Sequence, residues 1–159
     1  MNGIFVALTI SATILADATE KPQWISDYGV AIQAAKSAQQ PLLVVLDKPN
    51  EPGQRFEQAS YTSDKTQLAL LSNYKLCRVD VTTPYGRKVA EAFEATQFPY
   101  TVITDKTCTK IRYSKVGHLG TEEWITTLAE YKSGQRSKQF VSRRSSLWNG
   151  ERSGRICFT

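Results

Sequence analysis

One stretch of the sequence, residues 41–47 (Pro-Leu-Leu-Val-Val-Leu-Asp), restricts the possible fold more than any other. Its five consecutive apolar residues are typical of a strand covered on both faces, as in the centre of a parallel α/β sheet. The stretch continues into a Pro- and Gly-containing loop, residues 48–53, and then into a helix-like segment, residues 54–60. Ligands of open α/β sheets usually bind at such strand-to-helix junctions. The sequence therefore predicts an α/β fold with a candidate site at this junction.

The other apolar patterns form an alternating series of helix-like and strand-like segments. Helices are predicted over residues 28–39, 64–73 and 87–95, and from Thr121 as N-cap to Gly134. Strands are predicted over residues 76–81, 100–104 and 110–116, the last two forming a hairpin around residues 105–108. This order favours one domain with a central sheet flanked by helices.

The N-terminus begins with an apolar run, residues 4–15, followed by Ala16-Asp17-Ala18, which fits a signal-peptidase site. The run is too short to span a bilayer. We therefore expect a signal peptide at residues 1–18, a secreted or periplasmic location, and no membrane-spanning segment after its removal. No Lys or Arg precedes the run, so an ordinary N-terminal strand or helix is the alternative.

The net charge of +5 is concentrated at the C-terminus. Residues 135–159 contain six basic side chains against Glu151 alone, whereas residues 1–134 contain equal numbers of acidic and basic side chains. The same C-terminal residues are rich in Ser, Arg and Gly, which predicts a flexible basic tail. Because the charges of residues 1–134 cancel, this part of the chain gives no reason to expect nucleic acid as a partner. A tail that acts as an electrostatic tether is one alternative function.

The three cysteines, Cys77, Cys108 and Cys157, fit neither a C-x-x-C motif nor any metal-ligand spacing. We therefore predict no metal and no cofactor. Cys77 lies within a predicted strand and is expected to be a small buried hydrophobe. Cys108 is expected in an exposed turn. Cys157 could pair with Cys108 or another molecule, or remain free.

The order of segments over residues 24–134 resembles the thioredoxin fold. Residues 41–47 resemble its central strand, Phe98-Pro99 stands where the family has a cis-proline, and Lys115-Val116-Gly117 resembles the end of its hairpin. The resemblance implies a thioredoxin-like domain at residues 19–134, with a mixed sheet at its centre.

The sequence departs from the family at the active centre. Redox members carry C-x-x-C at the junction after the central strand, where this chain has Asn50-Glu51-Pro52-Gly53. Thiol–disulfide exchange needs a nucleophilic thiolate and a second thiol close to it. The resemblance therefore implies the fold without dithiol oxidoreductase activity. A redox or sensing protein that uses Cys108 alone is the alternative.

The resemblance also implies a binding surface. In redox relatives, the cis-proline lies beside the junction loop and holds an extended substrate through backbone hydrogen bonds. Losing the cysteines removes the chemistry but need not remove that geometry, so we expect a polypeptide partner. No pattern in the sequence indicates an oligomeric state. The expected contact residues are Asn50, Glu51, Pro52, Phe98, Pro99, Val116, Gly117 and His118.

Overall fold

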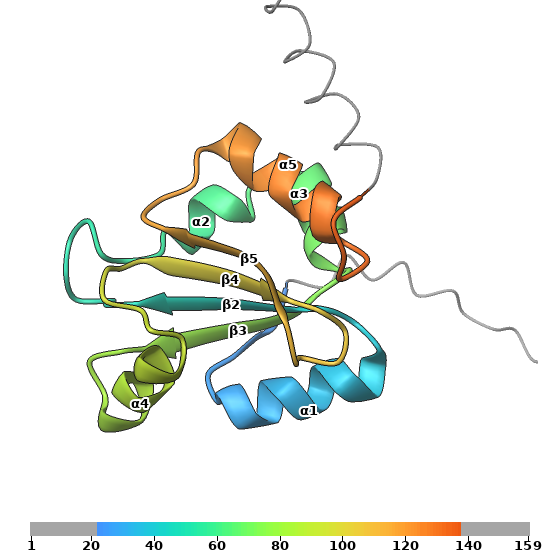
Figure 1. Ribbon diagram of the computed structural model, residues 1–159. Coiled ribbons are helices and arrows are strands. Elements are labelled where there is room, and N and C mark those ends of the chain that lie inside the picture. Colours follow the sequence, from blue (N-terminus) through green and yellow to red (C-terminus); the bar gives the residue numbers. More distant parts are fainter. Residues whose placement is uncertain (1–21, 138–159) are drawn as a thin grey trace, which may run out of the picture.

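The computed structural model describes residues 22–137, which form a five-stranded sheet with helices on both faces (Figure 1). The strand order is β1-β3-β2-β4-β5. The bounds are β1 Trp24–Ile25, β2 Leu42–Asp47, β3 Lys75–Asp80, β4 Tyr100–Thr104 and β5 Ile111–Val116. The predicted signal peptide and residues 138–159, which include Cys157, lie outside the described residues.

The central strand of the sheet is β2, as the apolar run predicted. All six of its residues are buried. It pairs in parallel with β3 on one side and antiparallel with β4 on the other, and β4 in turn pairs antiparallel with β5. The sheet is therefore mixed, which confirms the predicted fold class.

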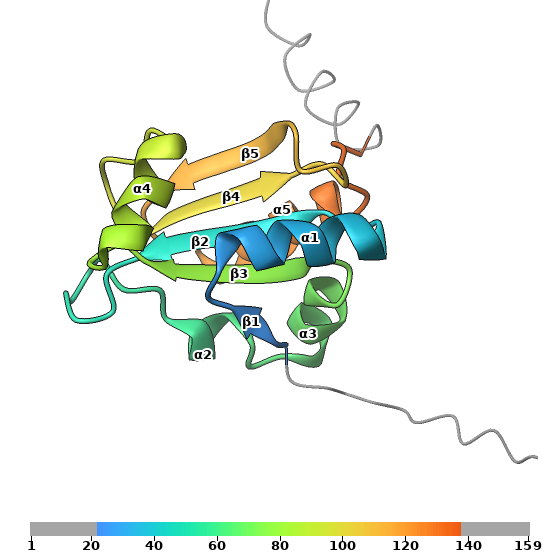
Figure 2. The same ribbon diagram turned by 90° about the horizontal axis from the view of Figure 1, so that it is seen from below.

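The helices divide between the two faces of the sheet. The helices are α1 Tyr28–Ala38, α2 Gln58–Tyr61, α3 Lys65–Leu71, α4 Pro84–Ala92 and α5 Thr121–Tyr131. Figure 2 shows α1 and α4 in front of the sheet, with α5 behind it. Alternate residues of β2 enter two separate cores: Leu43 and Val45 pack with residues from α2, α3 and α5, whereas Val44 packs with residues from α1 and α4.

The starts of α2, α4 and α5 differ from the sequence-based expectation. Helix α4 begins at Pro84 rather than residue 87, because the Thr83 hydroxyl accepts a hydrogen bond from the Gly86 N–H (2.9 Å) and Pro84 suits the first helical position. Helix α5 is capped by Gly120, and Thr121 is its first residue. Helix α2 begins at Gln58, so the loop after β2 is longer than predicted. The Asp27 cap of α1 is confirmed.

The first residues of the predicted tail contact the domain body. Arg136 forms an ion pair with Glu130 of α5, and the Ser137 N–H donates to the Glu130 carbonyl oxygen (3.0 Å). The ordered chain thus continues past Gly134. Among residues 22–137, no helix has the length and apolar character needed to span a membrane.

Candidate functional site

Three segments that are distant in sequence meet at one end of the sheet: the junction loop after β2, the Phe98-Pro99 pair before β4, and residues 116–118 at the end of β5. The Gly117 N–H donates to the Pro99 carbonyl oxygen at 2.7 Å. The His118 Nε2 lies 3.1 Å from the Gly53 carbonyl oxygen. We call these three segments together the junction surface; they hold all of the contact residues predicted from sequence.

The junction loop is folded by its own hydrogen bonds. The Glu51 N–H donates to the Lys48 carbonyl oxygen (3.1 Å), and the Gln54 N–H donates to that of Glu51 (3.1 Å). The Glu51 carboxylate lies 3.2 Å from the Lys48 ammonium and accepts from the Gln54 side-chain amide at 2.5 Å. Glu51 is therefore held between two neighbours of its own loop.

The Phe98–Pro99 peptide bond is cis, as the resemblance implied. Pro99 is buried and Phe98 is half-buried, with the Lys48 ammonium 5.8 Å from the Phe98 ring centroid. This is the distance of a cation–π contact. Within residues 22–137, the backbone N–H and C=O of Phe98 take part in no hydrogen bond.

Residues 116–118 form the edge of the junction surface. Val116 is 47% exposed, His118 is exposed, and Gly117 has φ of +85°, a conformation that favours glycine. The loop is fixed behind them, because Leu119 is buried and its carbonyl oxygen accepts a hydrogen bond from the Tyr61 hydroxyl at 2.9 Å. Val116 and His118 are therefore exposed on a segment that the buried Leu119 holds against the domain.

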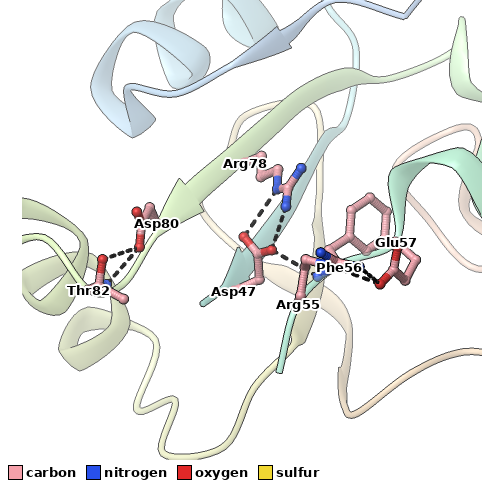
Figure 3. A network of polar contacts seen from close by, with 7 residues as sticks. All are labelled: Asp47, Arg55, Phe56, Glu57, Arg78, Asp80 and Thr82. Carbon is pink, nitrogen blue, oxygen red and sulfur yellow. Dashed lines mark hydrogen bonds and ion pairs between the residues drawn. The ribbon is translucent and has the colours of Figure 1, made fainter. Parts of the chain in front are cut away.

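A buried ion pair lies where β2 enters the junction loop and was not predicted from sequence (Figure 3). The Asp47 side chain is 0% exposed, and Arg78 of β3 donates to its two oxygens from Nε (3.1 Å) and Nη2 (2.7 Å). The Phe56 N–H donates to the same carboxylate at 2.8 Å. Asp47 thus ties the end of β2 to β3 and to the far end of the loop. The one sequence feature that could have indicated this ion pair is an Asp at the end of an otherwise apolar strand.

Aromatic packing anchors the chain immediately after the junction loop. Phe56 is buried and stacks on Tyr61, with ring centroids 4.7 Å apart and planes 8° apart. Trp24 and Trp124 contact the same ring at centroid distances of 5.4 and 5.8 Å. Both ends of the loop are therefore fixed, at Asp47 by the ion pair and at Phe56 by its neighbours.

No sulfur atom is present in the junction loop, and the two described cysteines lie elsewhere. Cys77 is buried in β3, where burial and the charge of Asp27 raise its pKa to about 12. Cys108 is half-buried rather than exposed as expected; burial raises its pKa, partly offset by the Thr104 side chain and Lys36. Both thiols are free. Residues 22–137 contain no cluster of His, Cys, Asp or Glu suited to a metal ion.

A mixed five-stranded sheet, helices on both faces and a cis-proline beside the junction loop together define a protein of the thioredoxin-fold class. The family model described as thioredoxin-like matches residues 23–106. The chain therefore belongs to the thioredoxin-like family. A comparison with curated protein sequences gave no match.

Solved structures with the same fold include several redox proteins. A thioredoxin from Thermus thermophilus is 16% identical, with 86% of this chain and all of that chain covered and a TM-score of 0.57. The C-terminal domain of DsbD from Neisseria meningitidis, in the oxidised form, is 10% identical, with 71% and 100% covered and a TM-score of 0.52. A disulphide isomerase from Xylella fastidiosa Temecula1 is 17% identical, with 67% and 95% covered and a TM-score of 0.51. At these identities the likeness establishes the fold alone.

Proposed function

We propose that this protein is an exported, non-catalytic member of the thioredoxin-like family that binds or supports another polypeptide. Its junction surface holds an extended segment of that partner and leaves the partner's covalent structure unchanged. The observation that carries the proposal is the assembled geometry of the junction surface around a loop, Asn50-Glu51-Pro52-Gly53, that contains no thiol.

The binding half of the proposal rests on the backbone at the cis-proline. The N–H and C=O of Phe98 are without partners within the described residues, and they lie beside a half-buried aromatic ring. An extended chain that pairs with exposed backbone groups gains affinity from main-chain hydrogen bonds and specificity from side-chain pockets. The exposed Val116 adds apolar contact area at the same edge.

The non-catalytic half rests on the thiols. A thiolate is the reactive form of cysteine, and burial raises the pKa of both Cys77 and Cys108, which disfavours that form. The same shift argues against the alternative of a redox or sensing protein that works through Cys108 alone. The signal-like sequence of residues 1–18 supports export and favours a secreted or periplasmic setting.

Paired substitutions on the junction surface test the proposal. Peptides that bind the full chain are first selected from a randomised eight-residue library, and their dissociation constants are then measured against variants. Phe98→Ala and Val116→Glu should each weaken binding about tenfold or more, because the first removes an aromatic contact and the second places a charge against the bound chain. Gly117 is less suitable, because a side chain at its positive φ strains the backbone.

Ile111→Glu is the matched control, because Ile111 is 52% exposed on the same strand but at its opposite end. It should leave peptide affinity unchanged. Thermal unfolding of each variant checks that the fold is retained. Equal affinities of the wild type, Phe98→Ala and Val116→Glu would refute the proposed site.

A further inference from the structure

A pocket of about 250 Å³ lies next to the junction surface, between the start of the junction loop and helix α4. We call it the α4 pocket. Two of its lining residues, Lys48 and Phe98, also belong to the junction surface, so the two features are continuous. Its remaining lining residues are Val81, Arg87, Ala90, Glu91 and Ala95.

The floor of the α4 pocket is apolar. Val81 and Ala90 are buried, whereas Ala95 and Phe98 are half-buried and present the part of the floor that a ligand can reach. Sites for cofactors and drug-sized molecules usually measure about 300–1,000 Å³. The α4 pocket is smaller than that range and suits a single large side chain.

The charged rim of the pocket has one cation without an acidic partner. The Lys48 ammonium is paired with Glu51. The Arg87 guanidinium donates to the Thr82 carbonyl oxygen (3.2 Å), but it forms no ion pair within residues 22–137. Glu91 follows one helical turn later and is also without an ion pair in the described part of the chain. A ligand carboxylate placed at the Arg87 side would thus be attracted, and one placed at the Glu91 side repelled.

We infer that the α4 pocket receives one large aliphatic or aromatic side chain of the bound polypeptide, with an Asp or Glu beside that side chain paired to Arg87. The inference rests on the proposed function, because it supplies the specificity of the same extended segment. Burial of the apolar side chain adds to the affinity that the main-chain hydrogen bonds supply. A basic residue next to the anchor side chain is repelled by Arg87. The opposite charges of Arg87 and Glu91 on the rim therefore set the direction in which the bound segment lies.

The first test is to fill the pocket. Ala95→Leu adds three carbon atoms at the half-buried floor, and Ala129→Leu, at a half-buried position on α5, is the matched control. The probes are the library peptides that bind the full chain, and for each one a version with its anchor residue replaced by Ser. Ala95→Leu should weaken the apolar-anchor peptides about tenfold and leave the Ser versions unaffected, whereas Ala129→Leu should change neither.

The second test is the sign of the charge effect. Arg87→Gln should weaken peptides with an acidic neighbour to the anchor by about two- to fivefold, and Glu91→Gln should strengthen them by a similar factor. Peptides with Lys at the neighbouring position should respond in the opposite direction. Both effects should shrink at high salt.

The outcomes separate this inference from the proposed function. If Phe98→Ala and Val116→Glu weaken binding but Ala95→Leu has the same effect as Ala129→Leu, the junction surface binds peptide and the inferred anchor pocket is wrong. The inference is also overturned if the selected peptides show no enrichment of large apolar residues. It is overturned as well if Arg87→Gln or Glu91→Gln changes the affinity of acidic and basic peptides in the same direction. If Phe98→Ala and Val116→Glu also leave affinity unchanged, the proposed function fails with it.

Discussion

Removing the Asp47 carboxylate should strongly destabilise the domain. Asp47 is fully buried and accepts three hydrogen bonds, two from Arg78 and one from the Phe56 N–H. Asp47→Ala leaves the Arg78 charge without its partner and the Phe56 N–H without an acceptor. The substitution therefore weakens the attachment of the junction loop at both of its ends, at Asp47 and at Phe56.

The magnitude follows from the burial of the two partners. Breaking a buried ion pair by removing one member costs about 3–5 kcal/mol. The Arg78 side chain is 26% exposed, so water can solvate part of the guanidinium, and we expect a loss near the lower end, about 3 kcal/mol. Domains of this size are stable by only about 5–15 kcal/mol, so Asp47→Ala removes a large share of the total.

Urea unfolding of the full chain and its variants measures this loss. Asp47→Asn keeps an acceptor for the Phe56 N–H but loses the charge, so it should cost about 1–3 kcal/mol, less than Asp47→Ala. Arg78→Met leaves Asp47 as an unpaired buried charge and should cost at least as much as Asp47→Ala. The double variant Asp47→Ala/Arg78→Met should be more stable than the sum of the two single losses predicts.

Two results would refute this reasoning. One is an Asp47→Ala loss below about 1 kcal/mol, the value typical of an exposed pair. The other is additivity of the two single losses in the double variant, which would mean that Asp47 and Arg78 stabilise the domain independently.

The remaining predictions concern the thiols and the C-terminal segment. Purified protein should show no turnover in a disulfide-reduction assay, because residues 50–53 contain no cysteine; turnover equal to that of a C-x-x-C thioredoxin would contradict this. The pKa of Cys77 is raised from 9.0 to about 12, so this thiol ionises in the unfolded chain before it does so in the folded protein. Stability should therefore be constant below pH 8 with respect to this group and fall by about 1.4 kcal/mol between pH 8 and pH 10, as measured by urea unfolding. Cys77→Ala should remove that part of the decline, and an unchanged decline would rule out Cys77 as its source. Limited proteolysis should leave a resistant fragment that extends at least to Ser137, since Arg136 and Ser137 are bonded to Glu130; cleavage at Gly134 would contradict those contacts.

The sheet could be predicted because its strands carry strong local signals. The unbroken apolar run of β2 identifies a strand buried on both faces, and the β-branched residues of Tyr100–Thr104 identify β4. Phe98-Pro99 is an ordinary dipeptide by composition, and only the resemblance to a family indicated a cis bond there. The start of α4 was placed too late because the Thr83-Pro84 capping signal was read as part of a loop.

The supports of the site depend on tertiary contacts that leave little trace in a sequence. Asp47 and Arg78 are 31 positions apart, and only the parallel register of β2 and β3 brings them together. Phe56 stands in a loop-like, polar stretch, yet it packs between Trp24, Tyr61 and Trp124, three residues from different parts of the chain. Neither the ion pair nor the packing of Phe56 can be predicted from the spacing of apolar residues along the sequence.

The central claim is that the junction surface binds an extended polypeptide without chemical change. The most direct measurement is an NMR titration of the isotope-labelled full chain with a library-selected peptide, followed by mass spectrometry of both molecules. The account predicts amide shift changes concentrated at residues 48–53, 98–99 and 116–118, and unchanged masses for protein and peptide. Shift changes centred on another face of the domain, or a covalent adduct between peptide and protein, would contradict it.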